Sequence, residues 1–267
     1  MRTRGAFHKK SEKGKPLVSI ITVVRNGEKY LEQTIQSVLN QTYENIEYII
    51  IDGASTDGTL NIIRKYDDQI AYWMSEPDGG IYDAMNKGIG LSSGEIIGII
   101  NSDDWYKEDA VSKVIVEFRK LPNISIFHGD MGRYALSGEL DRVVVPMYPR
   151  MSLIYGCTIN HPTCFVDIKT YQQLRGFNLS LDLASDYEFL LRVWKSGGNF
   201  YYINSVLTNF RLGGYSSNFI KSAVQAHKAR CLNGINRATS LASMLRLFIL
   251  HYAKNLLELL GVMKSGL

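Results

Sequence analysis

The sequence predicts an α/β protein built on a mostly parallel central sheet that is flanked by helices. Between Leu17 and Gly94, short runs of β-branched residues alternate with helical patterns, an order typical of parallel strands joined by covering helices. Each of these runs ends in a polar segment, and doubly wound sheets bind their ligands beyond the ends of their strands. The 267 residues are 45% hydrophobic, which allows one large domain with an appendage and excludes a disordered chain.

The hydrophobic pattern divides the chain into three parts. Residues 1–16 form a basic tail that we expect to be solvated, because the apolar run after it is too short to span a membrane. Residues 17–215 form the main domain, with halves 17–121 and 122–215. Residues 216–267 form an amphipathic helical extension.

Cysteine content and charge exclude several classes of protein. An odd number of cysteines without CxxC spacing argues against a disulfide framework and a zinc site, and fits a reducing compartment. The cysteines are Cys157, Cys164 and Cys231. The net charge of +4 is too small to demand nucleic acid, and the basic residues alternate with aliphatic rather than stacking aromatic ones.

In the first half, apolar spacing predicts alternating strands and helices. The predicted strands are Val18–Val24, Ile46–Ile51, Ile70–Met74 and Ile96–Ile100. The predicted helices are 30–39, 60–66 and 81–88, the last with Gly88 at its carboxyl end.

In the second half, the pattern is more mixed. It predicts a hairpin from Ile124–His128 to Arg142–Val145, a loop over Met147–Gly156, a strand over His161–Val166, a helix over Ile168–Leu174, a helix over Asp186–Lys195 and helical structure from Asn218 onward.

The adjacent carboxylates Asp103 and Asp104 follow a buried strand and indicate a metal site. Neighbouring carboxylates repel each other unless a cation or hydrogen-bond donors balance them. Carboxylate ligands suit Mg²⁺ or Mn²⁺, which keep some waters and take further ligands from substrate phosphates. The alternative is that Asp104 caps the helix that begins near Glu108.

Other strand ends carry groups suited to a nucleotide. Asp52 ends an apolar strand, so its carboxylate could accept from a nucleobase or a ribose hydroxyl, or could only form a turn. Gly79 and Gly80 let backbone approach a ligand at the start of a helix, whose amino end favours a diphosphate. Lys87 could equally be a solvated helix charge, and no P-loop motif is present.

Asp186 stands at the start of a helix and is a candidate general base for an acceptor hydroxyl. Its alternative role is that of a helix cap. His161 is a candidate acceptor or diphosphate contact, although most single histidines are core or turn residues. No Ser/His/Asp arrangement or GxSxG motif indicates acyl transfer.

Taken together, four segments resemble the inverting family 2 glycosyltransferases of GT-A fold. They are Val18–Asn26, Ile51–Thr59, Ser75–Gly88 and Asn101–Asp104. The resemblance extends from Leu17 to Gly214, and it is specific because the motifs occur in the family's order at strand ends. It implies that residues 17–121 bind a nucleotide sugar and that residues 122–215 bind the acceptor.

The resemblance also implies residue roles. The expected donor contacts are Thr22, Val24, Asn26, Asp52, Gly80, Asn86, Lys87, Ser102 and Asp103. Asp104 and Asp103 would hold Mn²⁺ or Mg²⁺, Asp186 would be the catalytic base, and His161 and Pro162 would lie on the acceptor side.

Two departures from the family pattern matter. Asp52-Gly53 replaces the two acids that many members have after the second strand. The expected contact with the nucleobase, and with it the identity of the nucleotide, therefore depends on fewer groups. Asn101-Ser102-Asp103-Asp104 replaces the strict DxD spacing, and we expect Asp104 to be the direct metal ligand, with Asp103 directed to ribose or metal.

The C-terminal extension is basic and apolar, with Glu258 as its only acid. It fits a helix on an anionic membrane surface, and equally a helix packed on the main domain or a second subunit. Relatives with a segment like Glu76–Lys87 resemble bacterial enzymes that build O-antigen or capsule units on polyprenyl diphosphate sugars.

The sequence therefore predicts a bacterial β-glycosyltransferase that moves galactose, glucose or N-acetylglucosamine from a UDP-sugar to a lipid-linked or oligosaccharide acceptor. It would act at the cytoplasmic face of the inner membrane or in the cytoplasm. Two alternatives stay open: a sugar-nucleotide pyrophosphorylase, whose Gly-rich N-terminal loop is missing, and a non-catalytic saccharide-binding protein of the same fold.

Overall fold

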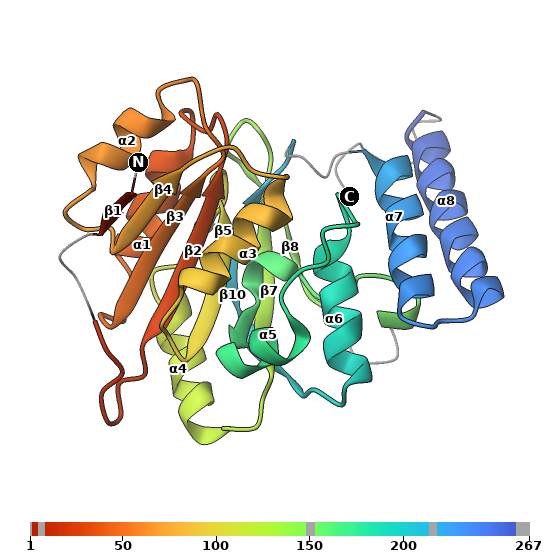
Figure 1. The fold of residues 1–267 in the computed structure, drawn as a ribbon. Helices are drawn as coiled ribbons and strands as arrows, with labels where there is room; N and C mark the ends of the chain where they lie inside the picture. The colour runs from red at the N-terminus through yellow and green to blue at the C-terminus, as the bar shows by residue number, and fades with distance from the viewer. Residues whose placement is uncertain (1, 5–8, 148–152, 214–217, 260–267) are drawn as a thin grey trace.

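The computed structural model of the protein describes residues 2–4, 9–147, 153–213 and 218–259, and its centre is a ten-stranded sheet (Figure 1). The strands are β1 (Arg2–Arg4), β2 (Val18–Val24), β3 (Ile46–Asp52), β4 (Tyr72–Ser75), β5 (Ile96–Asn101), β6 (Trp105–Tyr106), β7 (Ile126–Tyr134), β8 (Leu140–Val144), β9 (Phe165–Asp167) and β10 (Phe200–Arg211). The helices are α1 (Leu31–Leu39), α2 (Thr59–Lys65), α3 (Ile81–Leu91), α4 (Ala110–Lys120), α5 (Ile168–Leu174), α6 (Ser185–Lys195), α7 (Phe219–Leu232) and α8 (Arg237–Leu259).

The sheet is mostly parallel, as predicted. Its order is β1-β4-β3-β2-β5-β9-β7-β10-β6, and β8 pairs with β7. Strands β2 to β5 are mutually parallel, and β7 is parallel to β10. Because β9 is antiparallel to both β5 and β7, those two strands run in the same direction. The carboxyl ends of the parallel strands therefore meet at one edge, which we call the rim.

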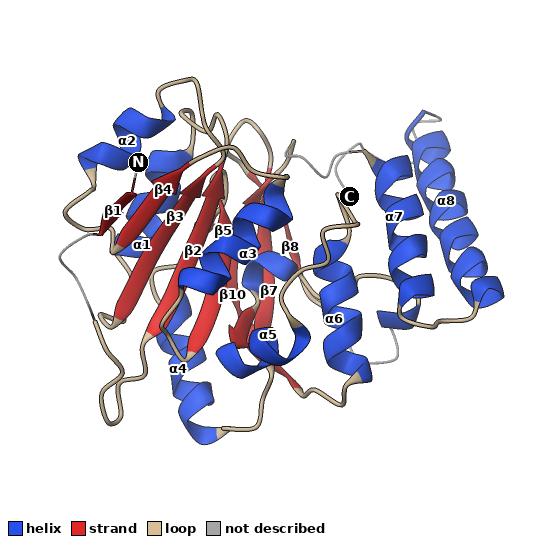
Figure 2. Ribbon diagram, viewed as in Figure 1, coloured by secondary structure: helices blue, strands red, loops and turns tan. Residues whose placement is uncertain are grey.

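Helices cover both faces of the sheet (Figure 2). Helices α1, α2 and α4 pack on one face, and α3, α5 and α6 pack on the other. All residues of β2 are buried, which explains why this strand reads as a continuous apolar run rather than an alternating one. The amphipathic helices of the first half are thus confirmed as cover for the sheet.

Helix α3 continues to Leu91, past the end predicted at Gly88. A Cβ atom at residue 88 would lie 2.5 Å from Cγ2 of Ile21 in β2. The glycine is therefore a point of close packing between helix and sheet, and the prediction that it ends the helix was wrong.

Several other boundaries differ from those predicted. Ile70 precedes β4, because its N–H closes the turn after α2 by donating to the carbonyl of Tyr66. The segment predicted as a strand from His161 begins instead with a 3-10 turn over His161–Thr163, and only Phe165–Asp167 form β9. Pro162 has no N–H for a strand ladder, which favours a turn at that point.

The predicted hairpin exists, but β7 runs on to Tyr134 and pairs with β8 through residues 131–134. Three strands were missed: the short β1 and β6 and the long β10. The basic tail is not solvated throughout, since Arg2–Arg4 add to the edge of β4. Residues 148–152 of the predicted loop and the domain boundary at 215 lie outside the described residues.

The predicted C-terminal helical extension is present as the antiparallel pair α7 and α8 beside α6 (Figure 1). Within the part of the chain that the structure describes, none of the helices combines the length and hydropathy needed to cross a bilayer.

Candidate active site

The turn after β2 joins the rim to the loop after β3. Asn26 adopts a left-handed conformation (φ 54°), which asparagine tolerates better than most residues. Its backbone N–H donates to Oγ of Ser55 at 2.7 Å, and its Oδ1 accepts the N–H of Thr56 at 2.9 Å. A Cβ on Gly27 would lie 3.2 Å from Oγ of Ser102, so the end of β5 also lies against this turn.

Asp52 ends β3 at the rim, where its carboxylate is fully buried. It accepts the N–H of Ser55 at 3.1 Å, Oγ of Ser55 at 2.5 Å and Oγ of Ser75 at 2.6 Å. These bonds fix the loop between two strand ends. A carboxylate has about four lone-pair sites, of which these three bonds leave one, and a nucleotide contact by Asp52 stays a prediction.

Two predicted donor contacts, Thr22 and Val24, belong to β2 and have buried side chains. The side chain of Thr22 is fully buried, and its Oγ1 lies 3.0 Å from the hydroxyl of Tyr48. Val24 is also buried, and its carbonyl accepts the N–H of Gly53 at 2.8 Å. Donor contacts by Thr22 and Val24 stay predictions, and for Val24 the prediction falls on its backbone at the end of β2, where it pairs with Asp52.

The carboxylates that follow β5 differ in accessibility. Asp104 is fully buried, with Oδ1 accepting the N–H of Arg211 at 3.0 Å and Oδ2 accepting Nδ2 of Asn101 at 3.3 Å. Asp103 is partly exposed. Burial and then the charge of Asp103 raise the pKa of Asp104 well above its usual range, and burial raises the pKa of Asp103. Asp103 is thus the more accessible of the two carboxylates, and which of them holds an ion directly stays a prediction.

Arg211, at the end of β10, was missed by the sequence analysis. Its guanidinium lies 4.0 Å from the ring centre of Tyr30 and 4.9 Å from that of Trp105, and it donates to Oε1 of Gln33 at 2.7 Å. Its Nε also donates to the carbonyl of Asp103 at 3.3 Å. Arg211 therefore holds the backbone of the carboxylate pair from across the sheet.

The carboxylates of Asp103 and Asp104 fit a divalent ion that takes most of its ligands from substrate and water rather than from the protein. No cluster of three or more acidic, histidine or cysteine side chains with metal-binding geometry occurs among the residues that the structure describes. Two adjacent carboxylates with raised pKa values, Asp103 and Asp104, are where a cation would relieve charge repulsion. Mg²⁺ and Mn²⁺ sites of this kind are completed by substrate phosphates and water.

The start of α3 presents backbone and charge to the rim. Gly80 is its N-cap at φ 116°, a conformation that favours glycine. Lys87 forms ion pairs with Glu76 at 3.1 Å and Asp83 at 3.2 Å. The side-chain amide of Asn86 forms two hydrogen bonds with the backbone of Phe177: its Nδ2 donates to the carbonyl at 2.9 Å, and its Oδ1 accepts the N–H at 2.8 Å. Asn86 therefore joins α3 to the loop before α6, and donor contacts by these side chains stay predictions.

Asp186 lies in the first turn of α6, whose N-cap is Ala184, so the capping alternative does not apply. Its Oδ1 accepts the hydroxyl of Tyr82 at 3.1 Å and the N–H of Tyr187 at 2.8 Å. His161 packs edge-on against Phe177. Burial lowers the pKa of His161 below its usual range, and the negative charge of Asp186 only partly opposes this shift. The candidate base therefore lies beside both α3 and the predicted acceptor histidine.

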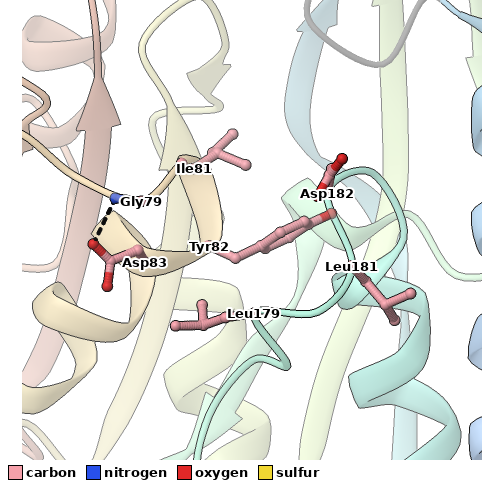
Figure 3. Close-up of a pocket in the computed structure, with 8 residues that line it drawn as sticks. Gly79, Ile81, Tyr82, Asp83, Leu179, Leu181 and Asp182 are labelled. Atoms are coloured by element: carbon pink, nitrogen blue, oxygen red, sulfur yellow. Dashed lines mark hydrogen bonds between the residues drawn. The ribbon is translucent and has the colours of Figure 1, made fainter.

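A pocket of about 90 Å³ opens between the start of α3 and the loop before α6 (Figure 3). Its lining residues are Gly79, Gly80, Ile81, Tyr82, Asp83, Leu179, Leu181 and Asp182. In Figure 3 the ring of Tyr82 points from α3 toward the loop that carries Leu181 and Asp182. Through Tyr82, this pocket adjoins Asp186.

Pro162 makes a structural contact, because its carbonyl accepts a hydrogen bond from Oγ1 of Thr208 at 2.8 Å. A contact of Pro162 with the sugar acceptor stays a prediction.

Tyr82→Phe is expected to lower kcat about tenfold and to leave the donor KM unchanged, because a hydrogen bond to a charged group contributes about 1.5–3 kcal/mol. The substitution removes the hydroxyl that holds Asp186 and keeps the buried ring. Steady-state kinetics would check this. Tyr66→Phe is the matched control, since its hydroxyl donates to Glu32 at 2.8 Å away from the rim.

The double variant Tyr82→Phe/Asp186→Asn shows whether the tyrosine acts through the aspartate. If it does, the double variant has the same activity as Asp186→Asn alone. A further loss of activity in the double variant would contradict the assignment of Tyr82 as a positioning residue.

The model of glycosyl transferase family 2 matches residues 19–141. An uncharacterized glycosyltransferase of Mycobacterium tuberculosis is 35% identical over 181 residues, 66% of this chain and 68% of the relative. A chondroitin synthase of Escherichia coli is 30% identical over 82% of this chain, but the match spans only 33% of that synthase.

Solved structures show the same architecture. Residues 1–349 of S. aureus TarS, in complex with UDP-GlcNAc, match with a TM-score of 0.66 and 16% identity, and the match covers 93% of this chain and 77% of the TarS 1–349 chain. A mannosyltransferase from Pyrobaculum calidifontis, in complex with GDP-Man and Mn²⁺, matches with a TM-score of 0.63 over 90% of this chain and 76% of its own, also at 16% identity. The chain has the GT-A fold and belongs to the family 2 glycosyltransferases.

Proposed function

We propose that this glycosyltransferase moves a hexose from a UDP-sugar, with inversion, to a hydroxyl of a lipid-linked sugar. The observation that carries this proposal is that two carboxylates stand in different surroundings, one after a strand that ends at the rim and one beside the start of α3. Asp103 follows β5 with raised pKa, and Asp186 lies beside the start of α3 with its carboxylate held by Tyr82. Asp103 suits a divalent ion that is also bound to the diphosphate of the donor, and Asp186 suits the abstraction of a proton.

The chemistry requires one displacement. Asp186 would take the proton of the acceptor hydroxyl while that oxygen bonds to the anomeric carbon and the bond from that carbon to the diphosphate breaks. Attack from the opposite side inverts the configuration, through a transition state of oxocarbenium character. A divalent ion, when bound at Asp103, supplies charge stabilisation for the departing diphosphate.

Comparisons with solved structures support a nucleotide-sugar donor of this class. TarS is solved with UDP and with UDP-GlcNAc, and the Pyrobaculum calidifontis mannosyltransferase is solved with GDP-Man and Mn²⁺. We propose galactose or glucose as the sugar, with N-acetylglucosamine as the next candidate, and Mn²⁺ or Mg²⁺ as the ion. We further propose a polyprenyl diphosphate acceptor at the cytoplasmic face of a bacterial inner membrane, in O-antigen or capsule synthesis.

Calorimetric titration with UDP, GDP and their sugar conjugates, with and without Mn²⁺, tests the donor site. We expect metal-dependent binding of UDP and one UDP-sugar. Incubation with that donor and a synthetic polyprenyl diphosphate sugar should then give a β-linked product. Binding without transfer to any acceptor would favour a saccharide-binding protein, and no binding of any nucleotide would refute the proposal.

A further inference from the structure

Helix α8 directs an apolar side to solvent. Leu241, Leu245, Ile249, Tyr252 and Leu256 recur at spacings of three and four residues and therefore form one line along the helix, which we call the α8 stripe. All five are exposed, Leu245 by 58% and Ile249 by 67%. A surface helix of a globular protein ordinarily has polar residues there. The arrangement is the reverse of that expected for a helix facing only water.

The other side of α8 is occupied by α7, which prevents the stripe from turning inward. Ser240 is buried and accepts Nε of Arg230 at 2.9 Å, and its hydroxyl lies 2.7 Å from Nδ1 of His227. Phe219 stacks on His251 with ring centres 3.9 Å apart. In Figure 1, α8 is the outermost helix, beyond α6 and α7. The stripe is thus a fixed outer surface of the molecule.

The charge around the stripe is of one sign. Arg237 and Arg246 are exposed on α8 beside the stripe, whereas Lys221 and Lys228 of α7 contact the loop before α6. The sequence has no Asp or Glu from Leu212 to Leu257. Two copies placed face to face along the stripe would bring Arg237 and Arg246 of both copies together, with no Asp or Glu between Leu212 and Leu257 to neutralise them. An anionic lipid surface offers both an apolar layer and phosphates to such a helix.

We propose that the α8 stripe inserts into the headgroup region of an anionic lipid bilayer, with Arg237 and Arg246 at the phosphates. The helix would lie in the plane of the surface, since it cannot cross it. This docking is independent of the proposed sugar transfer, because it requires neither donor nor acceptor.

The surface is also connected to the pocket beside Asp186. Nζ of Lys221 forms an ion pair with Asp182 at 3.2 Å, and Nζ of Lys228 donates to the carbonyl of Ser180 at 2.7 Å. Asp182 lines the pocket, and the loop that holds both residues leads directly into α6. Helix α7 therefore stands between the proposed lipid surface and the candidate acceptor site.

Co-sedimentation with vesicles of phosphatidylglycerol and phosphatidylethanolamine, without sugar nucleotide, tests the docking. We expect binding to these vesicles, little binding to pure phosphatidylcholine, and weaker binding in high salt. Leu245→Ser/Ile249→Ser should reduce the partition coefficient at least about tenfold, because each substitution removes buried apolar surface from the bilayer. The matched control is Leu136→Ser/Leu140→Ser, which replaces two leucines of similar exposure on the β7–β8 hairpin.

The two double variants give distinguishable results. Loss of vesicle binding in the α8 variant alone, with unchanged circular dichroism and Tm, supports the proposal. Equal binding of wild type and α8 variant would overturn it. So would a wild-type dimer in light scattering that becomes monomeric in the α8 variant without any vesicle binding, since the stripe would then be an interface between copies. Because the assay contains no donor, failure here leaves the transferase proposal intact.

Discussion

Asp186→Asn is expected to lower the transfer rate by roughly 10²–10⁴-fold while donor binding is retained, because an amide cannot take the proton of the acceptor hydroxyl. Asparagine keeps the size of the side chain, so the oxygen that accepts from Tyr82 and from the N–H of Tyr187 can stay in place. The measurement is initial-rate transfer together with calorimetric titration of the donor. In this variant the transfer rate should fall while the dissociation constant of the donor stays unchanged.

Asp68→Asn controls for the loss of a carboxylate, because Asp68 is exposed and lies beyond α2 in a turn far from any proposed contact. We expect wild-type rates from it. If Asp186→Asn instead kept more than a tenth of the activity, Asp186 would not be the base. If it lost donor binding as well, its role would lie in the donor site.

Asp103→Asn is expected to lower metal-dependent affinity for the nucleotide diphosphate at least about a hundredfold, since changes to residues merely behind a metal ligand already cost 10–100-fold. Asp103 is the accessible member of the pair, whereas Asp104 is bonded to Arg211 and Asn101. Titration of UDP at a series of Mn²⁺ concentrations measures the effect. Without metal, the variant and the wild type should bind UDP equally weakly.

Asp104→Asn is the matched comparison and should retain the metal dependence. The carboxyl of Asp104 has a raised pKa, so it binds a proton more readily in the folded state than in the unfolded chain. Its contribution to stability therefore falls as pH rises from its ordinary range through the raised pKa. Relative to the wild type, the Tm of the variant with the neutral amide should accordingly rise as the pH goes from acid to 7. Loss of metal dependence in Asp104→Asn but not in Asp103→Asn would reverse our assignment.

Sequence periodicity predicted the main architecture because the burial of each strand or helix sets the spacing of apolar residues within that element. Strands such as β2 and β5 are buried on both faces and so appear as continuous β-branched runs. The same property hides the direction of individual side chains, such as that of Thr22, whose hydroxyl lies beside that of Tyr48 inside the sheet. Gly88 was misread for a similar reason, since close packing on Ile21 has no local sequence signature.

Residues of the candidate site that follow strands or open helices could be found from the sequence, as Asp103 and Asp186 were. Arg211 could not, because it reaches Asp104 across 107 positions of the chain, and nothing in its neighbourhood distinguishes it from a solvated arginine. Its aromatic partners Tyr30 and Trp105 come from two further segments. Only the sheet order, with β10 between β7 and β6, brings these groups together.

The contacts of Lys221 with Asp182 and of Lys228 with Ser180 have a consequence for acceptor choice. On a bilayer, the α7–α8 pair would act as a spacer of fixed height between the lipid surface and the pocket. A sugar carried on a short diphosphate stalk would be presented at one distance only, and longer saccharides would pass beyond the base. The length of the growing chain, rather than the identity of its last sugar alone, would then decide which molecules this enzyme extends.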